Sequence, residues 1–240
     1  MNDFSQISKD FNPNITAPHY LTRNRLLKDI SELVSCIDAE TLLDFGCGSK
    51  PYKSLFRVKN YIGLDFENQG HPHLNESIDV FYDGKVIPFE DKHFDAVFST
   101  EVFEHVFNLE AILRELNRVL KPQGKMLVTC PFTICEHEVP NDFARYSSFG
   151  LKDLLERNGF EIIEQRKTGN SLEAIYQLRI MYIHQHITPL IRKIPVVRSA
   201  FRFFTYTFLN CMAILSNKLF PNTKDLYLNN VVLCKKKKDL

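Results

Sequence analysis

The first residues along the chain that could bind a small ligand lie in the segment Asp44-Phe45-Gly46-Cys47-Gly48, which directly follows an apolar run. Two glycines one residue apart allow a tight turn and let a ligand approach the backbone closely. A dinucleotide site would carry a third glycine three residues later, where this chain has Pro51. The acid Asp44 also favours a cationic ligand over a phosphate.

A second acid lies where a ribose could bind. The next apolar run ends in Gly63-Leu64-Asp65, about 20 residues after the glycine loop, and an acid in this position can accept both hydroxyls of a ribose. The alternative for such a lone acid is a helix cap or a solvated carboxylate. Its spacing from the glycine loop favours the ribose.

A third group combines acids with imidazoles. Glu101, Glu104 and His105 are spaced i, i+3 and i+4, which predicts one face of a helix beginning at Glu101. His137 follows a later strand and could approach the same pocket. We take Glu104, His105 and His137 as candidate acid–base catalysts and Glu101, Glu104 and His105 as candidate ligands of a divalent ion. The alternative is a structural role in holding the surrounding loops.

The elements that must position these residues are short apolar strands alternating with amphipathic helices. Such alternation predicts βαβ units and a doubly wound, mostly parallel sheet, which binds ligands at the carboxyl ends of its strands. The patterns predict strands at 41–45, 60–64, 78–81, 94–99, 125–130, 160–166 and 227–234, and helices at 20–36, 109–120 and 148–158.

Further motifs complete a recognisable set. Asp83-Gly84 opens the stretch DGKVIPF, followed by FDAVFSTEVFEHV, then RVLKPQG, and a proline ends the fifth strand. From about residue 20 to 166, the chain resembles class I S-adenosylmethionine-dependent methyltransferases of the "methyltransferase domain 11" type. The resemblance implies a Rossmann-like methyltransferase fold with seven strands, and S-adenosyl-L-methionine as cofactor.

The resemblance also implies where this cofactor would lie. Asp44 and the glycine loop would line its methionine end, Asp65 would take the ribose hydroxyls, and Asp83 would accept from the adenine amino group. The Gly84 amide would face the adenine ring, which Phe66 would cover unless it is only a core residue. The full expected set is Asp44, Gly46, Cys47, Gly48, Asp65, Phe66, Asp83, Gly84, Thr100 and Glu101.

Two further resemblances concern the acceptor side. The ExxEH arrangement of 101–105 is similar to one with which some related methyltransferases hold Mg²⁺ beside an accepting hydroxyl. The segment 137–147 resembles a loop of methyltransferases from surface-polysaccharide gene sets, which lies over the acceptor pocket. In this loop Asp142 and Arg145 could pair, and contact with substrate and a purely structural role remain equal alternatives.

The composition is uneven along the chain, although its net charge is only +1. Residues 1–173 carry 19 Lys and Arg against 27 Asp and Glu, whereas residues 174–224 carry seven cations and no acid. This basic and aromatic segment is too interrupted for a membrane span, and its longest uncharged run has 15 residues. It could lie on an anionic membrane surface, or form a lid or a dimer face. The acidic remainder argues against a nucleic-acid partner.

We therefore expect a single methyltransferase domain over residues 1–240, with a loose arm at 1–19 and a basic aromatic helical insert at 171–226 before the last strand. The expected reaction is O-methylation of a small-molecule, glycan or lipid-linked acceptor. The alternatives are a quinone or lipid-ring O-methyltransferase with Mg²⁺, and a non-catalytic cofactor-binding scaffold. Six cysteines without metal-binding spacing and a polar N-terminus favour a cytoplasmic protein, free or peripheral on the inner face of the membrane. The oligomeric state stays open.

Overall fold

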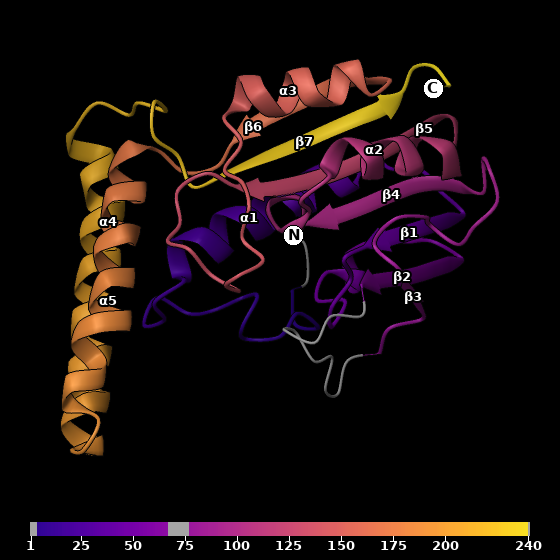
Figure 1. Ribbon diagram of the computed structural model, residues 1–240. Coiled ribbons are helices and arrows are strands. Elements are labelled where there is room, and N and C mark those ends of the chain that lie inside the picture. The colour runs from indigo at the N-terminus through magenta and orange to yellow at the C-terminus, as the bar shows by residue number, and fades with distance from the viewer. Residues whose placement is uncertain (1–3, 67–76, 240) are drawn as a thin grey trace. The chain divides into compact units, whose positions relative to one another are not determined.

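The computed structural model describes residues 4–66 and 77–239, and its central element is a seven-stranded sheet (Figure 1). The strand order is β3-β2-β1-β4-β5-β7-β6. The strands are β1 (Thr41–Phe45), β2 (Asn60–Phe66), β3 (Val80–Tyr82), β4 (Phe94–Thr100), β5 (Leu120–Pro131), β6 (Phe160–Lys167) and β7 (Asn229–Lys236). The expected doubly wound, mostly parallel sheet is thus confirmed.

Parallel pairing holds the strands that carry the predicted site. β1 pairs with β2 on one side and β4 on the other, β2 pairs with β3, and β4 pairs with β5, all in parallel. The last strand, β7, runs antiparallel to the others (Figure 1). All the carboxyl ends of β1 to β4 therefore meet at one edge of the sheet.

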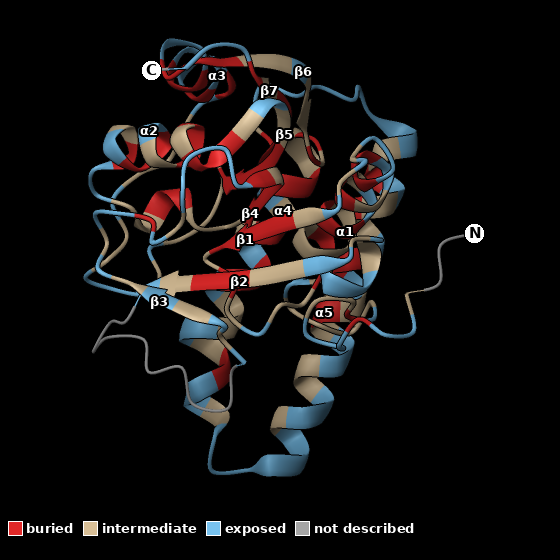
Figure 2. Ribbon diagram, turned by 90° about the vertical axis from the view of Figure 1, so that its right-hand side faces the viewer, coloured by how far each residue is buried: buried red, intermediate tan, exposed pale blue. Residues whose placement is uncertain are grey.

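The central strands are apolar because both of their faces are covered, as is typical of parallel sheets. Leu42, Leu43 and Phe45 of β1 are buried, as are Ala96 to Phe98 of β4. Figure 2 shows the buried residues concentrated in β1, β4 and β5. A rigid central layer of this kind fixes the positions of the loops at its edge.

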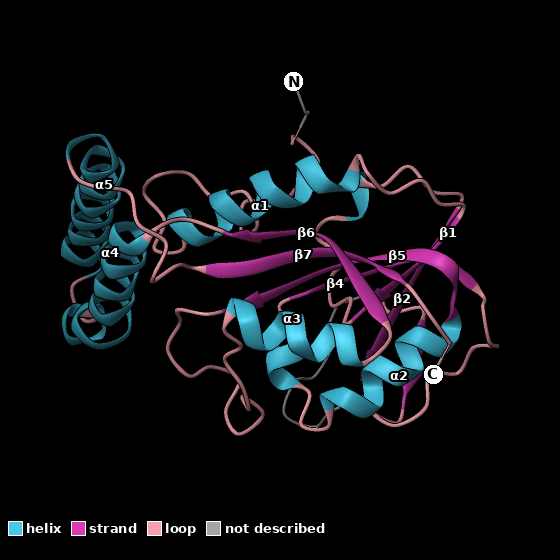
Figure 3. Ribbon diagram, turned by 90° about the horizontal axis from the view of Figure 1, so that it is seen from above, coloured by secondary structure: helices cyan, strands magenta, loops and turns pink. Residues whose placement is uncertain are grey.

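Two helices cover one face of the sheet, α2 (Leu109–Val119) and α3 (Ser148–Arg157) (Figure 3). The buried side of α2 carries leucine and isoleucine at helical spacing, including Ile112, Leu113 and Leu116. The side chain of Ser147 caps α3 by accepting a hydrogen bond from the Gly150 amide. These helices agree with the sequence pattern to within a residue or two.

The short strand predicted at 78–81 lies at Val80–Tyr82, and the strand predicted at 125–130 begins earlier, at Leu120. A larger difference concerns the helix predicted to begin at Glu101. Only one 3-10 turn forms there, η2 (Phe103–His105). Glu101 itself adopts a left-handed backbone conformation, with φ of 56°, which cannot start a right-handed helix.

The chain packs as two compact units, and α1 (Tyr20–Val34) is divided between them. The sheet unit comprises Ile30–Phe132, Glu136–Arg166 and Asn230–Leu240, and the helical unit comprises Met1–Asp29, Thr133–Cys135 and Lys167–Asn229. Every residue predicted to bind the cofactor or to catalyse lies within the sheet unit.

The helical unit contains the basic aromatic insert as a hairpin of helices. It consists of α4 (Ser171–Tyr182), a single π-helical turn η3 (Ile183–Ile187), the 3-10 turn η4 (Thr188–Ile191) and α5 (Pro195–Leu219). The small core between α4 and α5 includes Ala174, Ile180, Tyr206, Leu209 and Ala213. The expected helical character of residues 171–226 is therefore present in this unit.

Residues 4–19, expected to be a loose arm, have no helix or strand, and the first three residues of that arm lie outside the described residues. The segment is nevertheless held against the hairpin. The amide of Asn210 donates to the carbonyls of Ile15 and Ala17, and the amide of Gln177 donates to that of Pro18. Buried amides need such partners, which explains why this segment is fixed.

None of the helices in the described part of the chain has both the length and the apolar character needed to span a membrane.

Candidate active site

A cavity of about 350 Å³ opens at the carboxyl ends of β1 to β4, within the sheet unit. This is the edge at which doubly wound sheets bind their ligands. Most of the lining comes from strand ends and the loops that follow them. The lining residues are Phe45, Gly46, Asp65, Phe66, Tyr82, Gly84, Glu101, Val102, His105, Val106, Phe107, Asn108, Glu138, Asn141 and Phe143.

The glycine loop after β1 has no room for a side chain. Gly46 has a φ of 71°, and a Cβ placed on it would lie 2.6 Å from Val102 Cγ1. Gly48 also has a positive φ, and its amide donates to Asp65 Oδ2 at 2.8 Å. The loop thus presents bare backbone to the cavity and is tied to the end of β2.

Asp65 and its neighbours shape the next part of the cavity. Asp65 Oδ1 accepts from the Phe66 amide at 2.8 Å, so a backbone amide donates to each of its carboxylate oxygens. The Phe66 ring is exposed and lies against Gly84, where a Cβ would come within 2.9 Å of it. The ring edge and the bare Gly84 backbone form one wall of the cavity.

Asp83, expected beside Gly84, does not line the cavity. Its Oδ1 accepts from the amides of Lys85 and Val86, and these bonds hold the pKa of Asp83 below its ordinary value. The second carboxylate oxygen has no part in that turn. Asp83 therefore stabilises the loop after β3 in this conformation, and Gly84 supplies the surface that faces the cavity.

Asp44 is buried beneath the glycine loop. Tyr61 donates a hydrogen bond to Asp44 Oδ2 at 2.6 Å, while Oδ1 is buried without a hydrogen-bond partner. Burial raises the pKa of Asp44 to about 7, against the lowering effect of the Tyr61 bond. A buried oxygen without a donor is costly, and Asp44 itself does not line the cavity. Cys47 is buried nearby, and burial raises the pKa of its thiol.

The end of β4 is strained. The left-handed conformation of Glu101, unusual for a residue with a side chain, is held by a hydrogen bond from its amide to the Thr129 carbonyl. Thr129 also donates its hydroxyl to Glu101 Oε1 at 2.8 Å and lies 2.9 Å from the Thr100 hydroxyl. Such strain is found preferentially at functional sites, and here it places Glu101 in the cavity wall.

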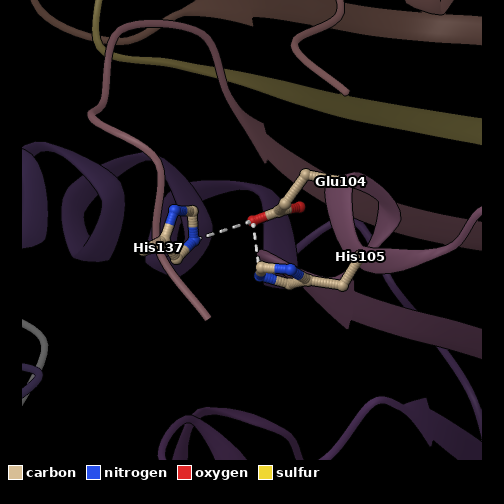
Figure 4. A group of neighbouring side chains, drawn as sticks. All are labelled: Glu104, His105 and His137. Carbon is tan, nitrogen blue, oxygen red and sulfur yellow. Dashed lines mark ion pairs between the residues drawn. The ribbon is translucent and has the colours of Figure 1, made fainter. Parts of the chain in front are cut away.

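The structure brings Glu104, His105 and His137 together, in place of the expected set of Glu101, Glu104 and His105 (Figure 4). His105 Nε2 and His137 Nε2 lie 3.7 and 4.0 Å from Glu104 Oε1. Glu101 is absent from this group because the predicted helix does not form and Thr129 holds its carboxylate elsewhere. Of the three clustered residues, only His105 lines the cavity.

Glu104 is fully buried, and neither of its carboxylate oxygens has a hydrogen-bond partner. Burial raises its pKa well above the ordinary value, and the nearby charge of Glu101 adds to the rise, while Arg145 opposes it. Its main-chain carbonyl accepts from the Phe143 amide at 2.8 Å, which attaches the following loop to η2. Glu104 therefore holds a proton much more readily than an exposed carboxylate does.

A short hydrogen bond orients the imidazole of His105. His105 Nδ1 lies 2.7 Å from the Asn141 carbonyl, which can only accept, so Nδ1 carries the proton and Nε2 is a bare acceptor in the neutral ring. His137 Nδ1 lies 3.4 Å from both an Arg145 nitrogen and Asp142 Oδ2, one a donor and the other an acceptor. His105 is thus set up to take a proton.

The loop that carries His137 is fixed by the predicted pairing of Arg145 with Asp142. The two side chains form a bidentate ion pair with distances of 2.5 and 2.6 Å, and this pair holds the pKa of Asp142 at about 2. The Asp142 carboxylate also accepts from the His137 amide at 3.0 Å. The ion pair therefore positions His137 and the Asn141 carbonyl that orients His105.

Several lining residues were not expected from the sequence. Asn141 and Glu138 belong to the singled-out loop, but no pattern indicates that one would orient His105 and the other would come within 3.7 Å of its Nε2. Phe107 and Phe143 pack together, with ring centroids 5.3 Å apart, and both are exposed at the cavity. The only signal in the sequence is that these two aromatic residues stand in segments predicted to be loops.

The clustered donors do not suit Mg²⁺. This ion prefers oxygen ligands in near-octahedral geometry, whereas the cluster offers two imidazoles and one carboxylate. The carboxylate also lies in the field of the Arg145 cation. We therefore derive no chemical step through Mg²⁺ at this site.

Comparison with known proteins connects this cavity to a family. Residues 43–128 match the family described as "Methyltransferase domain". An uncharacterized protein of Methanocaldococcus jannaschii is 32% identical over 126 residues, covering 51% of this chain and 55% of that protein. The O-methyltransferase rstn1 of Aspergillus nomiae is 24% identical over 165 residues, which cover 58% of this chain and 72% of its own. The match thus spans about half the length of the first of these relatives.

Solved structures agree in fold. A phosphoethanolamine N-methyltransferase of Haemonchus contortus, solved in complex with S-adenosyl-L-methionine, superposes with a TM-score of 0.54 at 16% identity, covering 99% of this chain and 61% of that chain. Identity at this level indicates a shared fold and nothing more specific. The family match gives no evidence for the expected resemblance to methyltransferases from surface-polysaccharide gene sets. Together, the motif spacing, the strand order and the matched residues show that this chain carries a class I S-adenosylmethionine-dependent methyltransferase domain.

Proposed function

We propose that this protein is an O-methyltransferase that transfers the methyl group of S-adenosylmethionine to the hydroxyl of an acceptor with an apolar or ring-bearing body. The observation that carries the proposal is the bare Nε2 of His105, which faces the cavity at the edge where the cofactor loop lies. A base that is oriented in this way is needed for a hydroxyl acceptor.

The residues around the cavity fit the cofactor. The bare backbone at Gly46, where Val102 excludes a side chain, allows close approach, and the partnerless oxygen of Asp44 suits the cationic methionine end. In the proposal Cys47 and Gly48 complete this loop, and Asp65 accepts the ribose hydroxyls. Phe66 and Gly84 border the adenine, the Asp83 oxygen that the turn does not use would accept from the adenine amino group, and Thr100 and Glu101 lie beside the methionine end.

When bound, the cofactor supplies a methyl group on a positively charged sulfur, which retains the electron pair of the broken bond. The oxygen of the acceptor forms the new bond to carbon while its O–H bond breaks, and the proton passes to His105 Nε2. The imidazolium formed lies 3.7 Å from both Glu138 Oε2 and Glu104 Oε1. The exposed Glu138 carboxylate stabilises the positive charge, and general-base assistance of this kind contributes typically 10²–10⁴-fold to a rate.

Glu104 and His137 act in this proposal through His105. Glu104 is closed off from the cavity, so its contribution is to orient and stabilise the imidazole that touches the acceptor. His137 Nε2 lies 4.0 Å from the same Glu104 oxygen. Both are therefore positioning residues, and His105 is the catalytic one.

The acceptor class follows from the apolar part of the cavity wall. Val106, Phe107 and Phe143 present apolar surface to the cavity, which suits an aromatic ring or a lipid chain next to the hydroxyl. The name of the Aspergillus relative, an O-methyltransferase, is consistent with oxygen as the accepting atom. The assignment of residues 1–240 to a single domain, a cytoplasmic location and a glycan acceptor remain predictions within this proposal.

Cofactor binding is tested by calorimetric titration with S-adenosylhomocysteine. We expect Asp65→Asn to weaken binding about ten- to hundredfold, because hydrogen bonds to a charged group contribute about 1.5–3 kcal/mol each. The asparagine oxygen can accept from only one of the two backbone amides that donate to Asp65, so the thermal unfolding midpoint of the variant is measured alongside its affinity. Binding that is unchanged by Asp65→Asn would remove the ribose assignment.

Methyl transfer is tested with methyl-labelled cofactor and a panel of phenols, quinols and lipid-linked glycans, with amine analogues for comparison. His105→Gln should reduce O-methylation at least a hundredfold while leaving S-adenosylhomocysteine affinity unchanged. His93→Gln is the matched control, since His93 is exposed at the opposite end of β4. Full activity in His105→Gln would refute the base. Tight cofactor binding without transfer to any acceptor would favour the scaffold alternative.

A further inference from the structure

The hairpin of α4 and α5 has an inner face that is buried and an end that is not. Tyr206, Leu209 and Ala213 of α5 pack against α4, and the Tyr206 hydroxyl lies 2.9 Å from both His184 Nδ1 and Thr188 Oγ1. These contacts fix the turn between the helices. The surface beyond them is therefore presented on a rigid support.

The turn of the hairpin exposes a compact set of apolar side chains. We call residues 189–198 the hairpin tip; they comprise the end of η4, residues 192–194 that connect it to α5, and the first turn of α5. Leu190 is 77% exposed and Val196 is 81% exposed, and Ile194 and Val197 are each at least half exposed. Figure 2 shows the same end of the hairpin as almost continuously exposed. Clustered aliphatic exposure of this kind marks an interaction surface.

Cations are interspersed with these apolar residues. Arg192 and Lys193 are exposed and Arg198 is half-buried, all within the tip. The surrounding segment, residues 174–224, contains no Asp or Glu. A symmetric contact between two copies of the tip would bring like charges together without any acid to neutralise them. An anionic surface that also accepts aliphatic side chains satisfies both features.

We propose that the hairpin tip docks on the surface of an anionic phospholipid bilayer. Leu190, Ile194, Val196 and Val197 would enter the boundary between headgroups and acyl chains, while Arg192, Lys193 and Arg198 contact lipid phosphates. The attachment is peripheral, because the tip is far too short to cross the apolar layer. This inference extends beyond the proposed methyl transfer and does not depend on it.

The contribution of the three tip cations to membrane binding follows from a simple estimate. Each cation near an anionic leaflet contributes about 1 kcal/mol, which corresponds to about a fivefold change in partitioning. Replacing the three tip cations together should therefore weaken binding to anionic vesicles about a hundredfold at low salt. High salt should also weaken the binding of the unaltered protein to anionic vesicles.

The test is co-sedimentation of the full chain with vesicles of phosphatidylcholine, alone or mixed with phosphatidylglycerol. We expect binding to the mixed vesicles only. One variant combines Arg192→Gln, Lys193→Gln and Arg198→Gln, and another combines Leu190→Ser and Val196→Ser; each should lose at least tenfold in binding. Phe149→Ser, at an 80% exposed residue of α3, and Arg57→Gln are the matched controls and should bind unchanged.

Folding of every variant is checked by its calorimetric affinity for S-adenosylhomocysteine or, should that ligand not bind, by its thermal unfolding midpoint. Equal binding to neutral and anionic vesicles, or tip variants that bind as well as the unaltered chain, would overturn the proposal. A tip variant that changes the sedimentation coefficient of the free protein, without changing vesicle binding, would instead identify a contact between copies. Loss of binding on replacing Lys237 and Lys238 alone would place the membrane contact in the tail and also overturn it.

Discussion

Replacing Asp44 by asparagine should make the ligand-free protein more stable at neutral and alkaline pH. Asp44 is buried beneath the glycine loop, with one hydrogen bond from Tyr61 and one carboxylate oxygen without a donor. Asparagine has the same shape and keeps an oxygen for the Tyr61 hydroxyl, while removing the buried charge. The substitution therefore isolates the cost of ionising this carboxyl.

The magnitude follows from the shift in pKa. Burial raises the pKa of Asp44 from 3.8 to about 7, and at 1.36 kcal/mol per unit the full cost is about 4 kcal/mol. Between these two values the unfolded chain has lost the proton that the folded protein keeps. The free energy of unfolding attributable to Asp44 therefore falls as pH rises from about 4 to about 7. Above that range the penalty is complete and constant.

The assay is urea unfolding of the unaltered protein and Asp44→Asn at a series of pH values. We expect the two free energies of unfolding to be similar near pH 4 and to diverge in favour of Asp44→Asn by about 4 kcal/mol at pH 8. In parallel, calorimetry should show that S-adenosylhomocysteine binds more weakly to Asp44→Asn, because the negative partner of its ammonium group is lost. A difference in unfolding free energy that does not change with pH would refute this account of Asp44.

Two further predictions concern the same site. Gly46→Ala should lower the free energy of unfolding by about 2–4 kcal/mol, since it combines a left-handed backbone with a clash against Val102. The comparison is Gly150→Ala, where the φ is ordinary and a Cβ would meet only Ser147 Oγ at 3.3 Å, and it should cause a much smaller loss in the same urea unfolding assay. Methyl transfer should be unchanged after dialysis against a chelator, because the clustered donors do not suit Mg²⁺; activity that disappears and returns only with Mg²⁺ would contradict this.

Much of the sheet and of the cofactor loop could be predicted from the sequence. Runs such as Ala96 to Phe98 are apolar throughout because both faces of a central parallel strand are covered, and this pattern can be seen in a short stretch of sequence. The pair Gly46 and Gly48 marks a sharp turn for a reason that is also local, since glycine alone tolerates those backbone angles without strain.

The acid–imidazole group was only partly predictable. The spacing of Glu101, Glu104 and His105 favours a helix, but a hydrogen-bond network with Thr129 of the neighbouring strand holds Glu101 in a left-handed conformation. His137 joins the group instead, because the ion pair of the following loop fixes it there. Contacts between residues distant in sequence leave no periodic signal, so local patterns cannot reveal them.

The sequence by itself determined the mostly parallel sheet, the glycine loop and the acids near the ends of β1 and β2, because these depend on local backbone preferences and on the continuous burial of central strands. Only the tertiary structure decided how the imidazole at the cavity is oriented. His105 is oriented by the carbonyl of Asn141, and Glu104 is deprived of hydrogen-bond partners by complete burial. Both properties arise from packing between separate segments, which is where the desolvation of a carboxylate and the tautomer of an imidazole are set.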